Sequence, residues 1–305
     1  MSKKIIVFGS KGLVGSSVTR LLKNYDYEII ASSRNDTNLF FFDEVKKLIE
    51  EKKPDLIINA AAKVGGILAN DTQRSDFLLE NLKINMNILE AIIPFPEIGI
   101  INLGSSCIYP LDAKNPIKES SFMGGELEPT NSPYAMAKLT AIELGRSLKT
   151  QYGHKIINLM PTNLYGPNDN FDQETSHVIP GLISRMHKAH KENHKVFKIW
   201  GSGNPLREFL YVDDLSSCIK FIIENKIPVD LINVGSGEEI SILNLSKKIK
   251  AIIGFEGELI FDTNKPDGNP RKFLDSSVIN NLGWKSEVNL DTGLELTYKW
   301  FLKNI

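Results

Sequence analysis

Short apolar runs alternate with longer segments of helical spacing along the first half of the chain, and this alternation limits the folds open to it. The runs are apolar at consecutive positions, as in Lys4–Phe8, which is typical of strands buried on both faces. Strands alternating with helices predict βαβ units and a doubly wound, mainly parallel sheet with helices on both faces. We expect strands at Lys4–Phe8, Tyr27–Ala31, Asp55–Ala61, Ile98–Leu103 and Lys155–Met160, and helices at Leu13–Asn24, Glu44–Lys52, Phe77–Ile93 and Tyr134–Tyr152.

The pattern becomes less regular after Gly166, where a polar, turn-rich stretch begins. We expect residues 1–165, with a returning segment at about 208–236, to form the first domain. Residues 166–207 and 237–305 would form a smaller C-terminal α/β domain that holds a substrate. Its expected elements, with those of the returning segment, are His177–Asn193, Val196–Trp200, Phe209–Val212, Leu215–Glu224, Leu231–Val234, Ile240–Ile253, Glu258–Phe261 and Leu290–Leu302.

Charge and cysteine content narrow the classes of function. The chain has 36 basic and 37 acidic residues, so no general attraction to nucleic acid or to an anionic membrane is expected. Two cysteines exclude a disulfide framework, and with five histidines they show no metal-ligand spacing, so we expect no metal site. No apolar run reaches the roughly 18 residues that span a bilayer, and the N-terminal run is too short for a signal peptide. We expect a soluble cytoplasmic protein.

Three glycines lie between the first expected strand and the first expected helix, in the spacing G-x-x-G-x-x-G at Gly9, Gly12 and Gly15. A helix N-terminus binds anions, and glycines let backbone N–H groups approach a pyrophosphate closely. This position predicts a Rossmann-type dinucleotide site, although a purely structural turn is the alternative. At the end of the second strand, Arg34 suits a 2′-phosphate, and Lys11 could add a second charge. We expect NADP(H); the alternatives are two solvated cations or, because Asp36 is near, NAD.

Tyr134 and Lys138 are four residues apart, a spacing that places both on one face of a helix. An ammonium near a phenol should lower the pKa of the phenol and let it give a proton to a nascent alkoxide near neutral pH. The segment Gly104–Pro110 follows another expected strand, at the carboxyl edge where ligands bind in open α/β sheets. Ser105 there could hydrogen-bond a substrate carbonyl oxygen beside the tyrosine. Together these features predict a carbonyl-reducing site.

Glycine turn, strand-end serine and Y-x-x-x-K occur in the order of the extended short-chain dehydrogenase/reductase family, which the chain resembles over nearly its whole length. Within that family it is similar to the GDP-L-fucose synthases. The expected aromatic and proline of that family are replaced by Gln73 and Arg74. The segments that carry the resemblance are Ala60–Ile67 (AAAKVGGI), Gly104–Pro110, Leu127–Asn131 (LEPTN), Met160–Asn170 (MPTNLYGPNDN), Ser176–Pro180, Trp200–Gly203, Arg207–Asp214 (REFLYVDD) and Lys265–Lys272 (KPDGNPRK).

The resemblance implies an enzyme that epimerises C3 and C5 of GDP-4-keto-6-deoxy-mannose and then reduces C4 with NADPH. Tyr134 would be the proton donor, Lys138 would bind the nicotinamide ribose, and Ser105 would orient the keto oxygen. Cys107 and His177 would be the base and acid of epimerisation. A homodimer is implied too, through a four-helix bundle formed by helices Asn70–Glu90 and Tyr134–Tyr152 of each copy.

The family's binding residues fall on many positions of this chain. The implied cofactor contacts are Gly9, Lys11, Gly12, Leu13, Val14, Gly15, Arg34, Asn38, Leu39, Ala61, Ala62, Lys63, Leu103, Gly104, Lys138, Pro161, Asn163, Leu164 and His177. The implied contacts with the GDP-sugar are Ser105, Ser106, Cys107, Tyr134, Asn163, Val178, Arg185, Trp200, Arg207, Asp267 and Lys272.

Other interpretations remain open at this point. The enzyme could reduce C4 only, on a GDP-4-keto-6-deoxy-heptose, or the chain could be a non-catalytic NADP-binding regulator. A dehydratase would need carboxylates beside the strand-end serine, and Ser105–Cys107 has none. Cys107 could be a packed small hydrophobe, and His177 a neighbour of a helix cap formed by Ser176. The other four histidines, His154, His187, His190 and His194, are expected to be solvated.

Overall fold

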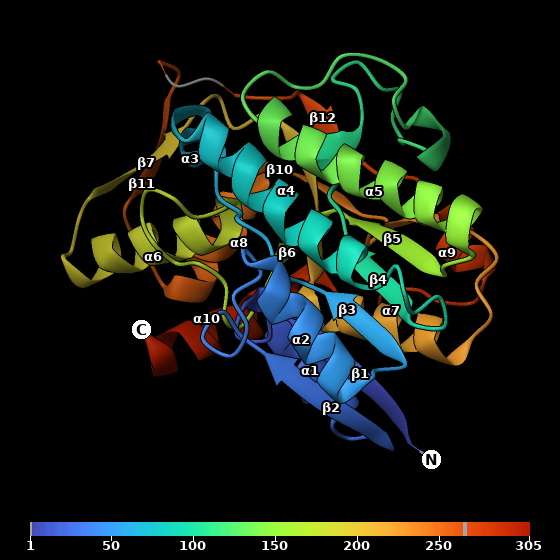
Figure 1. The fold of residues 1–305 in the computed structure, drawn as a ribbon. Helices are drawn as coiled ribbons and strands as arrows, with labels where there is room; N and C mark the ends of the chain where they lie inside the picture. The colour runs from blue at the N-terminus through green and yellow to red at the C-terminus, as the bar shows by residue number, and fades with distance from the viewer. Residues whose placement is uncertain (1, 265–266) are drawn as a thin grey trace.

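A six-stranded parallel sheet forms the centre of the molecule, with the strand order β2-β1-β3-β4-β5-β9. The computed structural model describes residues 2–264 and 267–305. The sheet confirms the predicted doubly wound α/β fold (Figure 1). Its strands are β1 (Lys3–Phe8), β2 (Tyr27–Ser32), β3 (Leu56–Asn59), β4 (Gly99–Leu103), β5 (Ile156–Pro161) and β9 (Leu231–Val234).

Helices cover both faces of this sheet, which explains the continuous apolarity of its strands. Ile5 and Val7 of β1 pack in one hydrophobic cluster, whereas Ile6 and Phe8 pack in another on the opposite face. The first cluster is covered by α1 (Leu13–Leu22) and α7 (Val212–Glu224). The second is covered by α2 (Phe42–Lys52), α4 (Arg74–Ala91) and α5 (Ser132–Tyr152), and α4 and α5 lie side by side in Figure 1.

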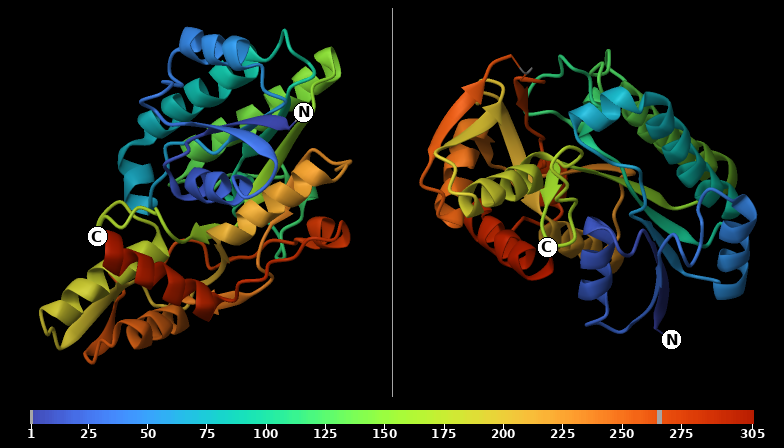
Figure 2. Two further views of the ribbon diagram at one scale, coloured as in Figure 1. Left: turned by 90° about the horizontal axis from the view of Figure 1, so that it is seen from below. Right: turned by 90° about the vertical axis from the view of Figure 1, so that its left-hand side faces the viewer.

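The remaining elements build two smaller sheets around a separate core, beside the main sheet (Figure 2). One sheet contains β6 (Asn163–Tyr165), β8 (Leu206–Tyr211), β10 (Glu239–Ser241) and β12 (Arg271–Lys272). The other pairs β7 (Val196–Trp200) with β11 (Glu258–Asp262). Their helices are α6 (Val178–Lys191), α8 (Ile242–Ile253) and α10 (Leu290–Asn304); α9 (Ser277–Asn281) follows β12.

Three local expectations are wrong. The helix expected over Asn70–Glu90 is broken at Gln73, where φ is −116° and ψ is 39°, so that α3 (Ile67–Thr72) and α4 are separate helices. His177, not Ser176, is the N-cap residue of α6. His154 is buried, at 1% exposure, because it lies where the chain turns from α5 into the central strand β5.

Within the described residues, no helix is both long and apolar enough to cross a membrane. In the same part of the chain, no group of three or more His, Cys, Asp or Glu side chains could hold a metal ion.

Candidate active site

The glycine turn between β1 and α1 forms a cradle that side chains would fill. Gly9 has φ of 73°, and a Cβ atom there would lie 2.8 Å from the backbone of Ala60. A Cβ atom on Gly15 would lie 2.1 Å from the carbonyl oxygen of Gly9. Gly12 is the N-cap of α1 and supplies no side-chain cap, so the N–H groups of the first turn, at Leu13 and Val14, are available to an anion. The cradle fits a dinucleotide pyrophosphate.

Charges at the end of β2 distinguish between the two nicotinamide cofactors. The carboxylate of Asp36 accepts hydrogen bonds from the N–H (2.8 Å) and hydroxyl (2.6 Å) of Ser33, and these bonds lower the pKa of Asp36. The Asp36 carboxylate is therefore already hydrogen-bonded to Ser33, a residue of the same turn. Arg34 is exposed, with its guanidinium carbon 4.7 Å from the centre of the Phe40 ring, and Lys11 is exposed in the glycine turn. A 2′-phosphate would find cations here.

The ends of β4 and β5 and the segments after β2, β3, β4 and β5 carry the other predicted cofactor residues. The Asn81 side chain accepts the N–H of Lys63 at 3.1 Å and donates to the carbonyl of Lys63 at 3.0 Å. The Lys63 ammonium contacts Glu80 at 2.9 Å. Gly104 is buried against Met160, and Asn163 donates to the carbonyl of Glu208 at 2.8 Å. Ala61, Ala62 and Leu164 are half-buried, Asn38 is half-buried before the buried Leu39, and Leu103 and Pro161 are buried strand ends.

Four predicted catalytic residues come together where β4 meets the start of α5. Ser105 is the N-cap of the short 3-10 helix Ser106–Ile108, and its hydroxyl accepts the N–H of Cys107 at 3.2 Å. Tyr134 lies in the first turn of α5 and hydrogen-bonds Ser105. Lys138, one turn later, donates its ammonium to the carbonyl of Leu103 at 2.7 Å, and its Nζ lies 5.7 Å from the centre of the Tyr134 ring.

The electrostatics of this cluster differ from the prediction. Burial raises the pKa of Tyr134, the charge of a Cys107 thiolate raises it further, and the hydrogen bond with Ser105 lowers it. The expected lowering by Lys138 is not found, because the ammonium points to Leu103 and burial dominates. Burial also lowers the pKa of Lys138 to about 8. The phenol is therefore protonated at neutral pH, as a proton donor must be.

His177 is the N-cap residue of α6 and lies in a segment that contacts the loop after β3. The N–H of Gly66 donates to the carbonyl of Thr175 at 2.9 Å. Cβ atoms on Gly66 and Gly181 would each lie 2.6 Å from Ser176, so two glycines make room for that residue. Desolvation by the surrounding protein lowers the pKa of His177. In the described part of the chain, no hydrogen bond joins His177 to Cys107 or Tyr134.

The predicted substrate residues supply cations and an aromatic face, and among them Arg207 has an electrostatic interaction with the cluster, through Cys107. The Arg185 guanidinium carbon lies 5.0 Å from the centre of the Trp200 ring, and both line a cavity of about 320 Å³. Lys272 and Arg207 are register partners on β12 and β8. Arg207 is near enough to Cys107 and Asp267 for both to raise its pKa, although burial lowers it more. Of the other predicted substrate residues, Val178 is exposed and Ser106 is buried. The Asp267 carboxylate accepts the N–H of Ser202 at 2.6 Å. Residues 265–266 of the KPDGNPRK segment lie outside the described residues.

Sequence reasoning missed Phe77, which contacts Tyr134, and two acids, Glu208 and Asp169, whose pKa values burial raises. Phe77 of α4 contacts Tyr134 edge to face, with ring centres 6.3 Å apart. Glu208 is fully buried, and its carboxylate accepts the N–H groups of Gly237 (2.8 Å) and Leu274 (3.2 Å). Burial raises the pKa of Asp169 to about 7. For Glu208, an acid inside an apolar strand was the available signal; Phe77 and Asp169 had none.

Comparison with known proteins adds three findings. Residues 5–235 match the family described as "NAD dependent epimerase/dehydratase family". A GDP-L-fucose synthase of Sinorhizobium fredii is 44% identical over 303 residues, covering 99% of this chain and 96% of that protein. The Escherichia coli GDP-L-fucose synthase is 43% identical over 315 residues, with 100% and 98% covered.

Two solved structures are also similar to this chain. A GDP-L-fucose synthetase from Naegleria fowleri bound to NADP has a TM-score of 0.91 and 31% identity, covering 99% of this chain and 93% of that chain. MlghC, a GDP-mannoheptose C4 reductase from Campylobacter jejuni with NADP bound, has a TM-score of 0.88 and 30% identity, covering 99% and 98%.

Proposed function

The chain belongs to the NAD dependent epimerase/dehydratase family, and on that basis we propose that it is an NADPH-dependent reductase of a GDP-4-keto-6-deoxy-sugar. The proposed reaction is that of the GDP-L-fucose synthases, in which epimerisation at C3 and C5 precedes reduction at C4. The observation that carries this proposal is the cluster of Ser105, Tyr134 and Lys138 with Cys107 on the same strand-end turn.

In the reduction, Tyr134 gives its proton to the C4 oxygen as that oxygen becomes an alkoxide. The Ser105 hydroxyl accepts the N–H of Cys107 and keeps its own proton, which can be donated to Tyr134 or to the same C4 oxygen. Lys138 ties α5 to the end of β4, where the nicotinamide ribose would lie in the extended short-chain dehydrogenase/reductases. NADPH, when bound in the glycine cradle, supplies the hydride.

In the epimerisation, a Cys107 thiolate takes the proton from carbon 3 or 5, and the electron pair moves to the C4 oxygen as an enolate. Ser105 and Tyr134 stabilise that oxygen, so one hydrogen-bonding pair serves both half-reactions. His177 then returns a proton to the carbon from the other side of the sugar. The cations Arg185, Arg207 and Lys272 would hold the diphosphate, with Trp200 against a sugar or base face.

The proposal extends to domains and assembly. Residues 1–165 and about 208–236 would bind NADP(H), and residues 166–207 and 237–305 the GDP-sugar. We propose a homodimer through α4 and α5, because the exposed apolar side chains Leu79, Met86 and Met136 lie on these two adjacent helices. Both cysteines are free, in keeping with the reducing cytoplasm, where we expect the enzyme to act.

A second candidate is reduction of C4 without epimerisation, on a GDP-4-keto-6-deoxy-heptose. It is favoured by the similarity to MlghC, a GDP-mannoheptose C4 reductase. One extra carbon changes the binding free energy by only about 1–3 kcal/mol, so the same pocket chemistry could serve either sugar.

The test is NADPH oxidation by the purified protein with each of the two GDP-4-keto sugars, with products identified by NMR. We expect oxidation, and exchange of the C3 and C5 protons in D₂O. Unchanged configuration at both carbons would remove the epimerase half and favour the second candidate. NADP binding without turnover of either sugar would instead indicate a non-catalytic regulator.

Two variants separate the half-reactions. Tyr134→Phe should lower reduction by about a thousandfold, since it removes the proton donor. Cys107→Ser should stop C3 and C5 exchange and spare the reduction of a substrate that is already epimerised. Normal reduction of that substrate by both variants would show that the roles are assigned wrongly.

A further inference from the structure

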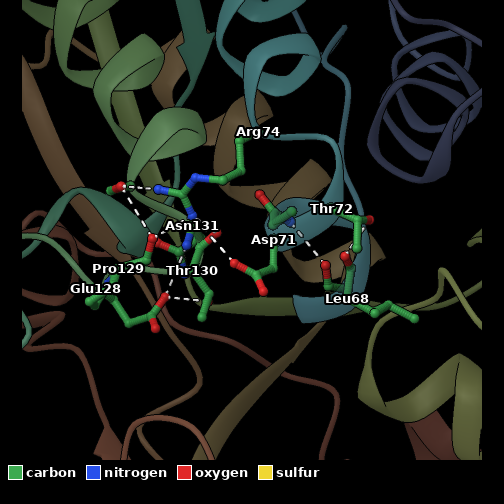
Figure 3. A network of polar contacts seen from close by, with 11 residues as sticks. Leu68, Asp71, Thr72, Arg74, Glu128, Pro129, Thr130 and Asn131 are labelled. Carbon is green, nitrogen blue, oxygen red and sulfur yellow. Dashed lines mark hydrogen bonds and ion pairs between the residues drawn. The ribbon is translucent and has the colours of Figure 1, made fainter.

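Arg74 begins α4 because the chain breaks at Gln73, the residue shared by the end of α3 and the start of α4. Helical side chains tilt toward the N-terminus of their helix. The Arg74 side chain accordingly extends past the start of α4 to the turn that precedes α5, as Figure 3 shows. A continuous helix through Gln73 would not give Arg74 this terminal position.

The guanidinium of Arg74 binds that turn at several points. It donates to the carbonyl of Pro129 at 2.8 Å, to the carbonyl of Thr130 at 3.4 Å, and to the hydroxyl of Ser132 at 3.2 Å. Its contact with Asp71, at 3.4 Å, is as long as the bond with Thr130 and joins two exposed side chains. An exposed pair of that kind contributes little, so the bonds across to the turn are the substantive ones.

These bonds fix the turn but do not cap α5, because a guanidinium only donates hydrogen bonds and an N-terminal cap must accept them. Asn131, the N-cap residue of α5, supplies no side-chain cap. The turn is also held by the Glu128 carboxylate, which accepts the Thr130 hydroxyl at 2.6 Å and the Asn131 N–H at 3.1 Å (Figure 3). Arg74 joins this self-contained turn to α4.

The first turn of α5 contains Tyr134, so α4 holds the tyrosine at two points. Arg74 bonds the hydroxyl of Ser132, two residues before it, and Phe77 contacts the tyrosine ring itself. Arg74 and Phe77 are three residues apart and so lie on one face of α4. One contact is polar and the other apolar, and both act on the start of α5.

We propose that Arg74 is a positioning residue for Tyr134: it fixes the first turn of α5 so that the phenol stays within hydrogen-bonding reach of Ser105 and the substrate carbonyl. This inference rests on the proposed function, which gives Tyr134 the proton transfer. Displacement of a catalytic group by 1 Å can cost about a hundredfold in rate, and partial fraying of one turn should cost about tenfold.

The test compares Arg74→Ala, Arg74→Lys and Ser132→Ala with Arg146→Ala. Arg146 is the matched control, because it also ties α5 to the protein, through Asp230 at 2.9 Å, but three turns beyond Tyr134. Arg74→Ala should lower kcat about tenfold while NADPH affinity and melting temperature stay near those of the wild type. Arg74→Lys, which can still reach one carbonyl, should recover part of kcat, as should adding ethylguanidinium to Arg74→Ala. Arg146→Ala should keep the wild-type kcat.

A double-mutant cycle and hydrogen exchange complete the design. Arg74→Ala with Ser132→Ala should lose little more activity than Arg74→Ala alone, because Arg74→Ala already removes the contact that the two share and leaves Ser132 a weak bond to the Pro129 carbonyl at 3.3 Å. Hydrogen exchange should quicken over residues 130–138 in Arg74→Ala, an outcome that does not need turnover. Failure of the wild type to reduce either sugar would refute the proposed function, whereas quickened exchange would still show that Arg74 fixes the turn. The inference is overturned if kcat stays within twofold, or if it falls together with NADPH affinity and melting temperature.

Discussion

The cofactor residues and the substrate residues of the candidate site are built on different principles. The cofactor side presents backbone: the cradle of Gly9 and Gly15, the first turn of α1, and the carbonyl of Leu103 that receives Lys138. The other side presents side chains, among them Arg185, Trp200 and Arg207. A ligand bound by backbone groups is displaced when a substitution adds volume. A ligand bound by charged side chains is weakened when a substitution removes a charge. Substitutions should therefore fail for different reasons on the two sides.

The largest expected effect is that of volume on the cofactor side. In Gly15→Ala the new Cβ would lie 2.1 Å from the Gly9 carbonyl oxygen, so the cradle must shift. Overpacking of this kind costs about 3 kcal/mol, which corresponds to a loss of roughly a hundredfold in NADPH affinity. Titration of cofactor fluorescence measures it. Gly153→Ala is the control for added volume, because nothing lies within 4 Å of its Cβ. The positive φ of Gly153 adds a backbone strain that this control does not remove. Unchanged NADPH affinity in Gly15→Ala would refute the conclusion that the glycine cradle binds the cofactor through its backbone.

Lys138 is the charged exception on the cofactor side, and pH should reveal it. Its pKa is about 8 in the folded protein and near 10.4 unfolded, so the folded state binds fewer protons between those values. Stability should rise as pH increases from 8 to 10, by up to about 3 kcal/mol relative to Lys138→Met. Urea unfolding at several pH values measures this, with Lys149→Met, exposed on the same helix, as the control. A constant difference between wild type and Lys138→Met would contradict it.

On the substrate side, Arg207→Ala should raise KM for the GDP-sugar about tenfold and leave NADPH affinity unchanged, because a charged hydrogen bond contributes about 1.5–3 kcal/mol. Steady-state kinetics at two salt concentrations would check it. Arg271→Ala, whose guanidinium reaches from β12 across β8 to Glu239 on β10, should change KM little. If NADPH affinity fell as much as sugar affinity, the two sides would not be separable.

The smallest expected effect is that of Arg34, a cofactor residue that would act through its side chain. Arg34→Ala should reduce the preference for NADPH over NADH about fivefold, since one exposed cation facing a phosphate contributes roughly 1 kcal/mol. The ratio of kcat/KM values for the two cofactors measures it, with Arg20→Ala as the control. A preference that does not change would mean that Lys11 or backbone groups select the cofactor.

The same contrast explains what the sequence could predict. The sheet followed from consecutive apolar residues such as Ile5–Phe8, which both faces of the sheet bury. The cofactor turn followed from glycine spacing, since backbone sites need particular residues at fixed local positions. The protonated state of Tyr134 could not be predicted from its spacing to Lys138, because it depends on burial and on where the ammonium points. The break at Gln73 lies within an unbroken helical pattern and left no local signal.

The buried carboxylate of Glu208 joins β8 to the turn at Gly237 and to Leu274, three segments distant in sequence. A Cβ on Gly235 would also collide with it, at 2.3 Å. The backbone of one segment cannot shift without the others, since a shift withdraws an N–H donor from a buried carboxyl group. New sugar preferences should therefore arise in the loops beyond this junction, or by exchange of the three segments as one module between relatives. Recombination that separates them should yield proteins that do not fold.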